Sequence, residues 1–424
     1  MSVVIQGTCG WSDHSLLDCK RFYPVNVKSS AEKLHYYSRC GNFGCVEVDS
    51  STYNIPTSST VSKWVDSSPN GFKFHFKAFG FLVNGGGKAS TLPNEIRSKF
   101  LLNSHCKDKY LSIDGIGDSA ASAIWKYFHD ALQPAKNAGK LGVVVFQFQL
   151  NILPCESSRR YIEYCANKLD SSINMGIEFR NRKWFDGLEL NRTRQWLSTI
   201  RSENNIALIC CDDLEHELYQ KDSDQCGLPP GKRLIHLPIY FNPSHGSKFI
   251  YVRVHRRFGN HRVLSESEIQ AWATRILSLD ERKEESSQRL YDPCPIYFLW
   301  GTDFEDQPII NAKNLAQALP KKFLPSFPVD TAKSVRPTLS GGILAAFARQ
   351  KEAPCTDEKA FAKKDDLTKR KFKDEPSTTT ISSSYKRGKV DSGIETKDSL
   401  QEETSARSSG KKKVSILGFF KPIK

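Results

Sequence analysis

The sequence predicts an α/β fold, a (β/α)8 barrel of the TIM type, followed by a disordered C-terminal tail. About eight short apolar runs rich in β-branched residues alternate with longer amphipathic segments through residues 1–325. Strands that alternate with helices pair in parallel through crossover connections, and eight such units fit a closed barrel. An open doubly wound sheet is the rival fold, but no glycine-rich phosphate loop follows the first run.

The apolar runs predict the strands of the barrel in order along the chain. Each is short, as barrel strands are, and most end in polar residues. The runs begin at Val3, Gly44, Phe72, Gly142, Asn174, Ile206, Phe249 and Cys294.

The segments between the runs predict the helices. Several open with Ser or Asn in the capping position, and "SESE" from Ser265 fits a capping box. These segments begin at Ser30, Ser59, Ser122, Ser158, Asn191, Ser265 and Asn311. The long irregular stretch 80–120 predicts an excursion over one face of the barrel.

Composition points to a globular protein with an anionic partner. Hydrophobic residues make up 39% of the 424 residues and charged residues 25%, while the net charge is +14. The 12 cysteines match no zinc-knuckle spacing, which favours a reduced intracellular compartment. The N-terminus lacks the pattern of a signal peptide, and no stretch has the apolar length of a membrane span, so we expect no membrane partner.

Residues 326–424 predict a disordered basic tail. The last 74 residues hold 18 Lys and Arg against 12 Asp and Glu, with few large apolar residues to offset the entropy of ordering them. Basic clusters lie at residues 363–364, 369–373, 386–389 and 411–413. Solvated charge runs are one interpretation, but four clusters in one tail favour nuclear import signals, an import receptor as partner, and a nuclear location.

The chain ends in an apolar motif, "KVSILGFF" at residues 413–420. It resembles a peptide that binds the sliding clamp PCNA: an aliphatic residue, two further residues, and then an aromatic pair. The residues that match are Lys413, where the glutamine of such peptides stands, Ile416, Phe419 and Phe420. The alternative is that the two phenylalanines fold back onto the barrel.

Polar residues gather where the predicted strands end, and this is the working face of a TIM barrel. Burying an unpaired charge is costly, so these groups must pair with each other or bind a ligand. Candidates for acid–base catalysis are Glu178, His255, Glu47 and Asp212. Lys77, Arg180 and Arg253 are candidates for binding phosphate or carboxylate. Mutual neutralisation of Glu178 and Arg180 is the structural alternative. The cofactor stays unknown; a divalent metal held by Glu47, Glu178, Asp212 and His255 is one option, which no tight ligand motif supports.

Eight motifs occur in the order typical of the YecE-like family, known as domain of unknown function 72. They are "GTCGWS", "FGCVEVDSSTYNIP", Trp64, "GFKFHFKAF", "KLGVVVFQF", "GIEFRNRKWF", "IYVRVHRR" and "NAKNLAQAL". The resemblance spans most of residues 3–320 and implies a TIM barrel. The matching site positions are Trp11, Glu47, Tyr53, Lys77, Gln147, Glu178, Arg180, Trp184, Arg253, His255 and Asn311. Among these, the resemblance adds Trp11, Tyr53 and Gln147 to the substrate-binding candidates.

Three functions are compatible with these features. The first is a nuclear enzyme that processes phosphodiesters of DNA in replication or repair, recruited by the sliding clamp through residues 413–420. The second is an enzyme acting on a small anionic metabolite, because most barrels of this kind act on metabolites. The third is an adaptor without catalytic activity that binds nucleic acid or the clamp.

Overall fold

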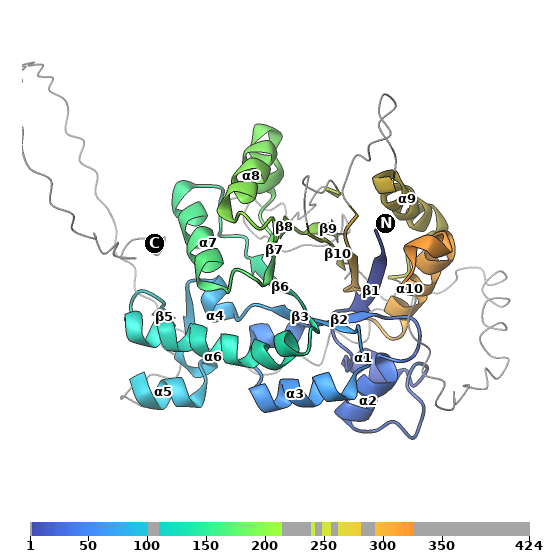
Figure 1. Cartoon of the computed structure of the whole chain (residues 1–424), viewed down its shortest axis with the longest axis horizontal. Coiled ribbons are helices and arrows are strands. Elements are labelled where there is room, and N and C mark those ends of the chain that lie inside the picture. The colour runs from blue at the N-terminus through green and yellow to red at the C-terminus, as the bar shows by residue number, and fades with distance from the viewer. Residues whose placement is uncertain are drawn as a thin grey trace, which may run out of the picture. The chain divides into compact units, whose positions relative to one another are not determined.

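Eight parallel strands form a closed ring in the computed structural model of the chain (Figure 1). The structure describes residues 2–100, 110–213, 239–241, 248–255, 262–280 and 293–325. One ladder runs β2-β3-β6-β7-β8 and the other β1-β11-β10-β9. The amide of Gly44 donates to the carbonyl of Gln6 at 3.0 Å, which joins β2 to β1. The second junction of the two ladders lies between β8 and β9, which are one strand interrupted at Ile209. The predicted (β/α)8 barrel is therefore confirmed.

The strands match the predicted apolar runs in number, order and place. They are β1 (Val4–Thr8), β2 (Cys45–Val48), β3 (Lys73–Lys77), β6 (Leu141–Phe148), β7 (Asn174–Phe179), β8 (Ile206–Leu208), β9 (Cys210–Asp213), β10 (Ile250–His255) and β11 (Ile296–Trp300). All neighbouring pairs within the two ladders are parallel. Their carboxyl ends therefore meet at one face of the barrel.

Amphipathic helices surround these strands (Figure 1). They are α1 (His14–Asp18), α2 (Ser30–Tyr37), α3 (Ser58–Ser67), α6 (Asp118–Asn137), α7 (Glu156–Lys168), α8 (Gly187–Ile200), α9 (Glu266–Leu277) and α10 (Gln307–Ala318). The capping box expected at Ser265 is present, because its hydroxyl accepts from the amide of Glu268 while that carboxylate accepts from the amide of Ser265. Within the described residues, no helix is both long and apolar enough to cross a membrane.

The stretch 80–120 is more ordered than the sequence predicts. It contains α4 (Gly80–Val83), β4 (Gly86–Lys88), the short 3-10 helix η2 (Ala89–Thr91), α5 (Asn94–Phe100) and β5 (Tyr110–Ser112). β4 and β5 pair antiparallel, and a Cβ built at Gly86, whose φ is +153°, would lie only 2.3 Å from the carbonyl oxygen of Leu111. These elements are too short to show a helical or alternating period, so the sequence did not reveal them.

Four further 3-10 turns complete the described residues. They are η1 (Asp49–Thr52), η3 (Arg182–Phe185), η4 (Ser278–Asp280) and η5 (Lys321–Phe323). The predicted tail at 326–424 lies outside the described residues, as do its basic clusters and the terminal motif with Lys413, Ile416, Phe419 and Phe420.

A buried histidine fills the barrel interior beneath the working face. His75 of β3 accepts a hydrogen bond at Nδ1 from the amide of Val143, 2.9 Å away in β6. Its ring meets those of Tyr251 and Tyr297 edge-on, with centroids 5.1 and 4.4 Å away. Burial lowers the pKa of His75 to about 3, so the ring is neutral. His75 lies opposite Glu47 in the ladder between β2 and β3, so its packing against Tyr251 borders the charged residues.

Candidate active site at the barrel mouth

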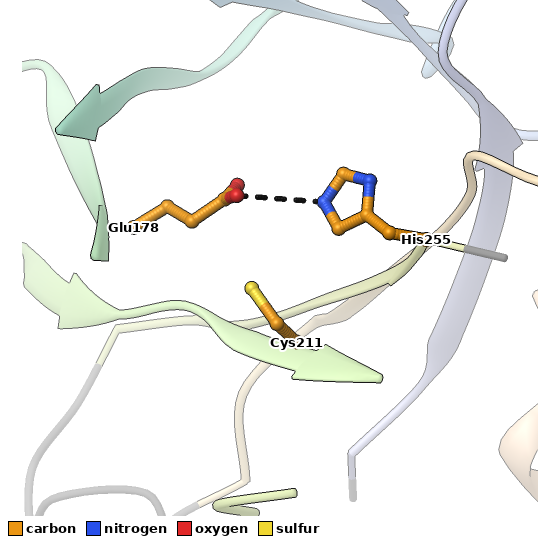
Figure 2. A group of neighbouring side chains, drawn as sticks. All are labelled: Glu178, Cys211 and His255. Carbon is orange, nitrogen blue, oxygen red and sulfur yellow. Dashed lines mark ion pairs between the residues drawn. The ribbon is translucent and has the colours of Figure 1, made fainter. Parts of the chain in front are cut away.

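Three side chains from three neighbouring strands point toward one another at the carboxyl ends of β7, β9 and β10 (Figure 2). They are Glu178, Cys211 and His255, all buried, and their ligand atoms all lie within 4.8 Å of one another. Nε2 of His255 is 3.5 Å from Oε1 of Glu178. The parallel register explains the meeting, since Cys211 lies opposite Arg253 in the ladder, two residues before His255.

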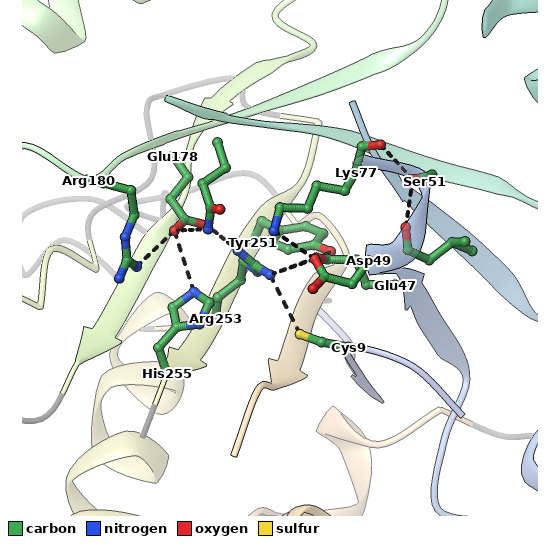
Figure 3. Close-up of polar contacts among 12 residues, drawn as sticks. Cys9, Glu47, Asp49, Ser51, Lys77, Glu178, Arg180, Tyr251, Arg253 and His255 are labelled. Carbon is green, nitrogen blue, oxygen red and sulfur yellow. Dashed lines mark hydrogen bonds and ion pairs between the residues drawn. The ribbon is translucent and has the colours of Figure 1, made fainter. Parts of the chain in front are cut away.

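Arg253 of β10 bridges two buried carboxylates (Figure 3). Its Nη1 donates to Oε2 of Glu178 at 2.5 Å, and its Nη2 donates to Oε1 of Glu47 at 2.7 Å. Both carboxylates are fully buried, and Arg253 is 1% exposed. Tyr251 donates its hydroxyl proton to Oε2 of Glu47 at 2.8 Å. One guanidinium thus holds side chains from β2 and β7 on opposite sides of the barrel.

Glu178 has further partners on its Oε1 atom. Gln147 donates from Nε2 at 2.8 Å, and Arg180 donates from Nη1 at 3.0 Å. Gln147 lies opposite Glu178 in the ladder between β6 and β7. The pairing of Glu178 with Arg180 that the sequence suggested as a structural alternative is therefore present, but it is one contact in a larger network.

Asp49 and Lys77 form the more accessible part of this network. Nζ of Lys77 is 2.8 Å from Oδ1 of Asp49, and the same oxygen is 3.7 Å from Nη2 of Arg253. The Asp49 side chain is 33% exposed, whereas that of Lys77 is 9% exposed. Ser51 fixes the turn that carries Asp49, because its hydroxyl lies 2.6 Å from the carbonyls of Val48 and Lys77.

The surroundings shift the pKa values of the two buried carboxylates, Glu47 and Glu178, in opposite directions. Burial raises the pKa of Glu47 to about 7 despite the opposing charge of Arg253, and the nearby carboxylate of Asp49 adds to the rise. Burial also raises the pKa of Glu178, but the positive charges of Arg253 and Arg180 outweigh it and hold that pKa well below its usual range. Glu178 is therefore ionised at neutral pH, while Glu47 is poised to exchange a proton.

His255 is neutral in this environment. Burial lowers its pKa to about 3, and the adjacent charge of Arg253 acts in the same direction. Neither ring nitrogen has a hydrogen-bond partner among the described residues, although the side chain is 1% exposed. A buried imidazole without partners is costly, so this side chain is the least satisfied group of the site.

Asp212 does not join the cluster, contrary to the sequence prediction. Its Oδ2 accepts a hydrogen bond from Nε1 of Trp272, 2.8 Å away in α9, which is packed outside the barrel. Successive residues of a strand point to opposite faces, so Cys211 takes the inward position. The optional metal site at Glu47, Glu178, Asp212 and His255 does not form as a set, because Asp212 points away and Arg253 lies between Glu47 and Glu178.

The remaining sequence-predicted residues lie around the site or support it. Tyr53 follows η1 and is 73% exposed, while Trp11 is buried and packs edge-on against Trp64 at 5.2 Å. Trp184 stacks on Phe179 and donates from Nε1 to the carbonyl of Ile152. Asn311 accepts from the amide of Leu264 and donates to the carbonyl of Arg262, which ties α10 to the segment after β10.

The sequence missed three members of the network: Cys9, Cys211 and Tyr251. Sγ of Cys9 lies 3.7 Å from Nη2 of Arg253. All three lie in or just after strands, where alternation indicates which residues share a face. They were overlooked because cysteine and tyrosine in apolar runs usually pack as hydrophobic residues.

A sequence model described as "Protein of unknown function DUF72" matches residues 5–332. The chain belongs to the DUF72 family. The matched residues contain every described barrel strand apart from Val4 of β1, and they contain every member of the Arg253 network, so the candidate site lies within the DUF72 region. This membership confirms the resemblance to the YecE-like family drawn from the sequence motifs.

This DUF72 protein shares low sequence identity with the following relatives. It is 26% identical to UPF0759 protein YunF of Bacillus subtilis (strain 168) over 204 residues, which are 48% of this chain and 59% of YunF. A DUF72 family protein of Enterococcus faecalis V583 has a similar fold, with a TM-score of 0.51 and 15% identity over 77% of this chain and 97% of that one. A DUF72 family protein of Thermotoga maritima MSB8 has a TM-score of 0.50 and 17% identity, over 74% of this chain and 98% of that one. These structures show the shared fold.

Proposed function

We propose that this DUF72 protein is a nuclear enzyme that processes phosphodiesters of DNA by acid–base chemistry at the barrel mouth. The observation that carries the proposal is the bridge from Arg253 to the fully buried Glu47 and Glu178. Well-packed apolar residues often stabilise a protein as much as a buried ion network does, or more. A network of this size at the working face of a barrel therefore favours a functional role.

The two carboxylates have different tasks in this proposal. Glu178 stays ionised and holds Arg253, Arg180 and Gln147 in place. Glu47 takes a proton from the attacking water as the water adds to phosphorus. The bond from phosphorus to the leaving sugar oxygen breaks, and the proton then passes from Glu47 to that oxygen.

Two cations near the opening suit an anionic substrate. Lys77 forms an ion pair with the part-exposed Asp49, and Arg180 forms one with Glu178. A phosphate group has oxygens for both cations, and the planar guanidinium of Arg180 can bind two of them. Arg180 lies beside Glu178, and the charge of Lys77 acts on Glu47, so a phosphate bound by Lys77 would lie near Glu47.

DNA and the nucleus are supported by the charge of the chain and by its tail. The net charge is +14, and the basic clusters of residues 363–413 resemble import signals. The motif at 413–420 would bring the enzyme to a sliding clamp at replication or repair sites. The sequence supports both of these points; the described residues do not include the tail.

A small anionic metabolite is the second candidate substrate. The complete burial of Glu47 and Glu178 favours it, because a small ligand reaches such groups more readily than a polynucleotide does. In that case the basic tail would set location without contributing to substrate binding.

An activity panel separates these functions. The purified full-length protein is incubated with nicked, flap and abasic DNA, and in parallel with phosphorylated sugars, with and without divalent metals. Cleavage of DNA supports the proposal, whereas turnover of a sugar phosphate alone supports the second candidate. No turnover in either arm, together with DNA binding by gel shift, would overturn the enzymatic proposal and leave an adaptor.

A further inference from the structure

We propose that Glu178, Cys211 and His255 form a zinc site with a fourth position open toward the barrel mouth. Three neighbouring strands place a carboxylate oxygen, a sulfur and an imidazole nitrogen within 4.8 Å of one another (Figure 2). Zinc sites that perform chemistry use three protein ligands of these types and leave one position for water or substrate. The catalytic meaning of this site rests on the proposed function, whereas metal binding stands by itself.

The spacing of the ligands suits a shared ion. Bonds of about 2.0–2.2 Å from a tetrahedral zinc to nitrogen and oxygen place these two ligands about 3.4 Å apart. Nε2 of His255 and Oε1 of Glu178 are 3.5 Å apart. This distance is long for a direct hydrogen bond, and neither ring nitrogen of His255 has a hydrogen-bond partner among the described residues. A metal ion between the two side chains would satisfy this buried imidazole.

The partners of Glu178 match the outer contacts of a metal ligand. Ligating carboxylates are usually held in turn by hydrogen bonds, which fix their orientation. Gln147 and Arg180 donate to Oε1 of Glu178, and Arg253 donates to Oε2. The two oxygens of a carboxylate offer about four lone pairs in total, so these three hydrogen bonds leave one for a metal.

The chemistry of the ligands selects zinc among the common divalent ions. A thiolate and an imidazole suit zinc, whereas magnesium and calcium prefer oxygen ligands. Glu47, Asp49, Glu178 and a Cys211 thiolate carry four negative charges, against three positive charges on Lys77, Arg180 and Arg253. Zinc would leave the mouth with one excess positive charge, which suits the anionic substrate proposed above. When bound, zinc would act there as a Lewis acid.

A cobalt and zinc titration tests this site. The full-length protein is stripped with a chelator and titrated first with Co²⁺, whose thiolate complexes show a charge-transfer absorption, and then with Zn²⁺. Cys210→Ala is the matched control, because it removes the neighbouring buried thiol on the opposite face of β9. We expect wild type and Cys210→Ala to bind one equivalent and show this absorption. Cys211→Ala should lose it and weaken zinc binding by more than about 100-fold.

A second variant guards against misfolding. His255→Gln should weaken zinc binding in the same way and change the cobalt spectrum, and circular dichroism checks that each variant is folded. Wild-type protein that binds no zinc, or folded Cys211→Ala that keeps the charge-transfer absorption, overturns the proposal. Because no substrate is used, an active enzyme that binds no zinc refutes only the metal site, and a zinc-binding protein without turnover refutes only the enzymatic function.

Discussion

Arg253 is the residue on which the barrel mouth depends. It is fully enclosed, and its guanidinium meets Glu47 on one side and Glu178 on the other. Removing it leaves two buried carboxylates without their shared counterion. Removing one partner of a buried ion pair costs more than the net contribution of the intact pair, because the remaining charge is then uncompensated.

We predict that Arg253→Met lowers the free energy of unfolding by about 3–5 kcal/mol. Urea unfolding followed by circular dichroism measures the change. The triple variant Arg253→Met, Glu47→Gln, Glu178→Gln removes the stranded charges and should recover a large part of the loss. A single variant as stable as wild type would mean that the guanidinium does not compensate these carboxylates.

The raised pKa of Glu47 should make the stability of the protein fall as pH rises. Its pKa in the folded protein is raised from 4.5 to about 7, so the folded state holds the proton more tightly than the unfolded state. The contribution of Glu47 to stability is therefore most favourable below about 4.5 and falls as pH rises to about 7. The charged or titratable groups that face Glu47 are Cys9, Cys45, Asp49, Lys77, Tyr251 and Arg253.

The variant Glu47→Gln isolates this effect because it removes the titration and keeps the size of the side chain. We expect the stability of wild type relative to Glu47→Gln to decrease between about pH 4.5 and 7, and to level off above that window. Unfolding in urea at several pH values gives both curves. Parallel curves through the window would show that the pKa of Glu47 is not raised.

Most site residues could be predicted at this scale, because strand ends and alternation indicate which side chains meet. Glu47, Lys77, Gln147, Glu178, Arg180, Arg253 and His255 lie together in the structure. The sequence predicts Asp212 as a site residue, whereas the structure places its neighbour Cys211 at the site. Alternation tells which residues share a face but not which face turns inward, and only contacts such as that of Asp212 with Trp272 decide this.

At the scale of elements, close packing between strands sets the geometry beneath the site. Gly142 at the start of β6 faces the imidazole of His75, and a Cβ built there would lie 2.5 Å from two ring atoms. The sequence predicts the strand that contains Gly142. It does not predict this need for glycine, because the contact joins residues far apart in the chain.

Gly142→Ala should therefore destabilise the barrel by about 1–3 kcal/mol through overpacking. Differential scanning calorimetry or urea unfolding would measure the loss. His75→Ala opens space beside residue 142, so the double variant Gly142→Ala, His75→Ala should lose less stability than the two single losses added together. Strictly additive losses would mean that the two sites do not clash.

The strand order could be predicted because eight apolar runs with interposed helices leave few topologies. Two features of the fold could not be predicted from the sequence. The interruption of the sixth strand at Ile209 depends on tertiary contacts, and the short elements between Gly80 and Ser112 have no periodic pattern.

At the scale of the whole molecule, the tail is predicted to determine where the barrel acts. We expect a fragment containing the terminal motif to bind a sliding clamp with about micromolar affinity, since three buried apolar side chains must offset the ordering of a flexible peptide. Replacing Phe419 and Phe420 with alanine should weaken binding by more than about 100-fold, because each aromatic ring contributes roughly 1.5–3 kcal/mol when buried.

Isothermal titration of the clamp with the full-length protein tests this expectation. Ser415→Ala lies within the motif but removes no apolar contact, so it should bind as wild type does. Equal affinity of the double phenylalanine variant and wild type would show that the terminal motif does not bind the clamp.

The central claim is that the Arg253 network is an active site, and catalytic turnover by a matched pair of variants tests it most directly. Glu47→Gln removes the proposed proton carrier, while Glu156→Gln makes the same change at the exposed start of α7. On the substrate identified by the activity panel, we predict that Glu47→Gln lowers kcat by about 100-fold or more and that Glu156→Gln matches wild type. A folded Glu47→Gln protein with the kcat of wild type would contradict the account.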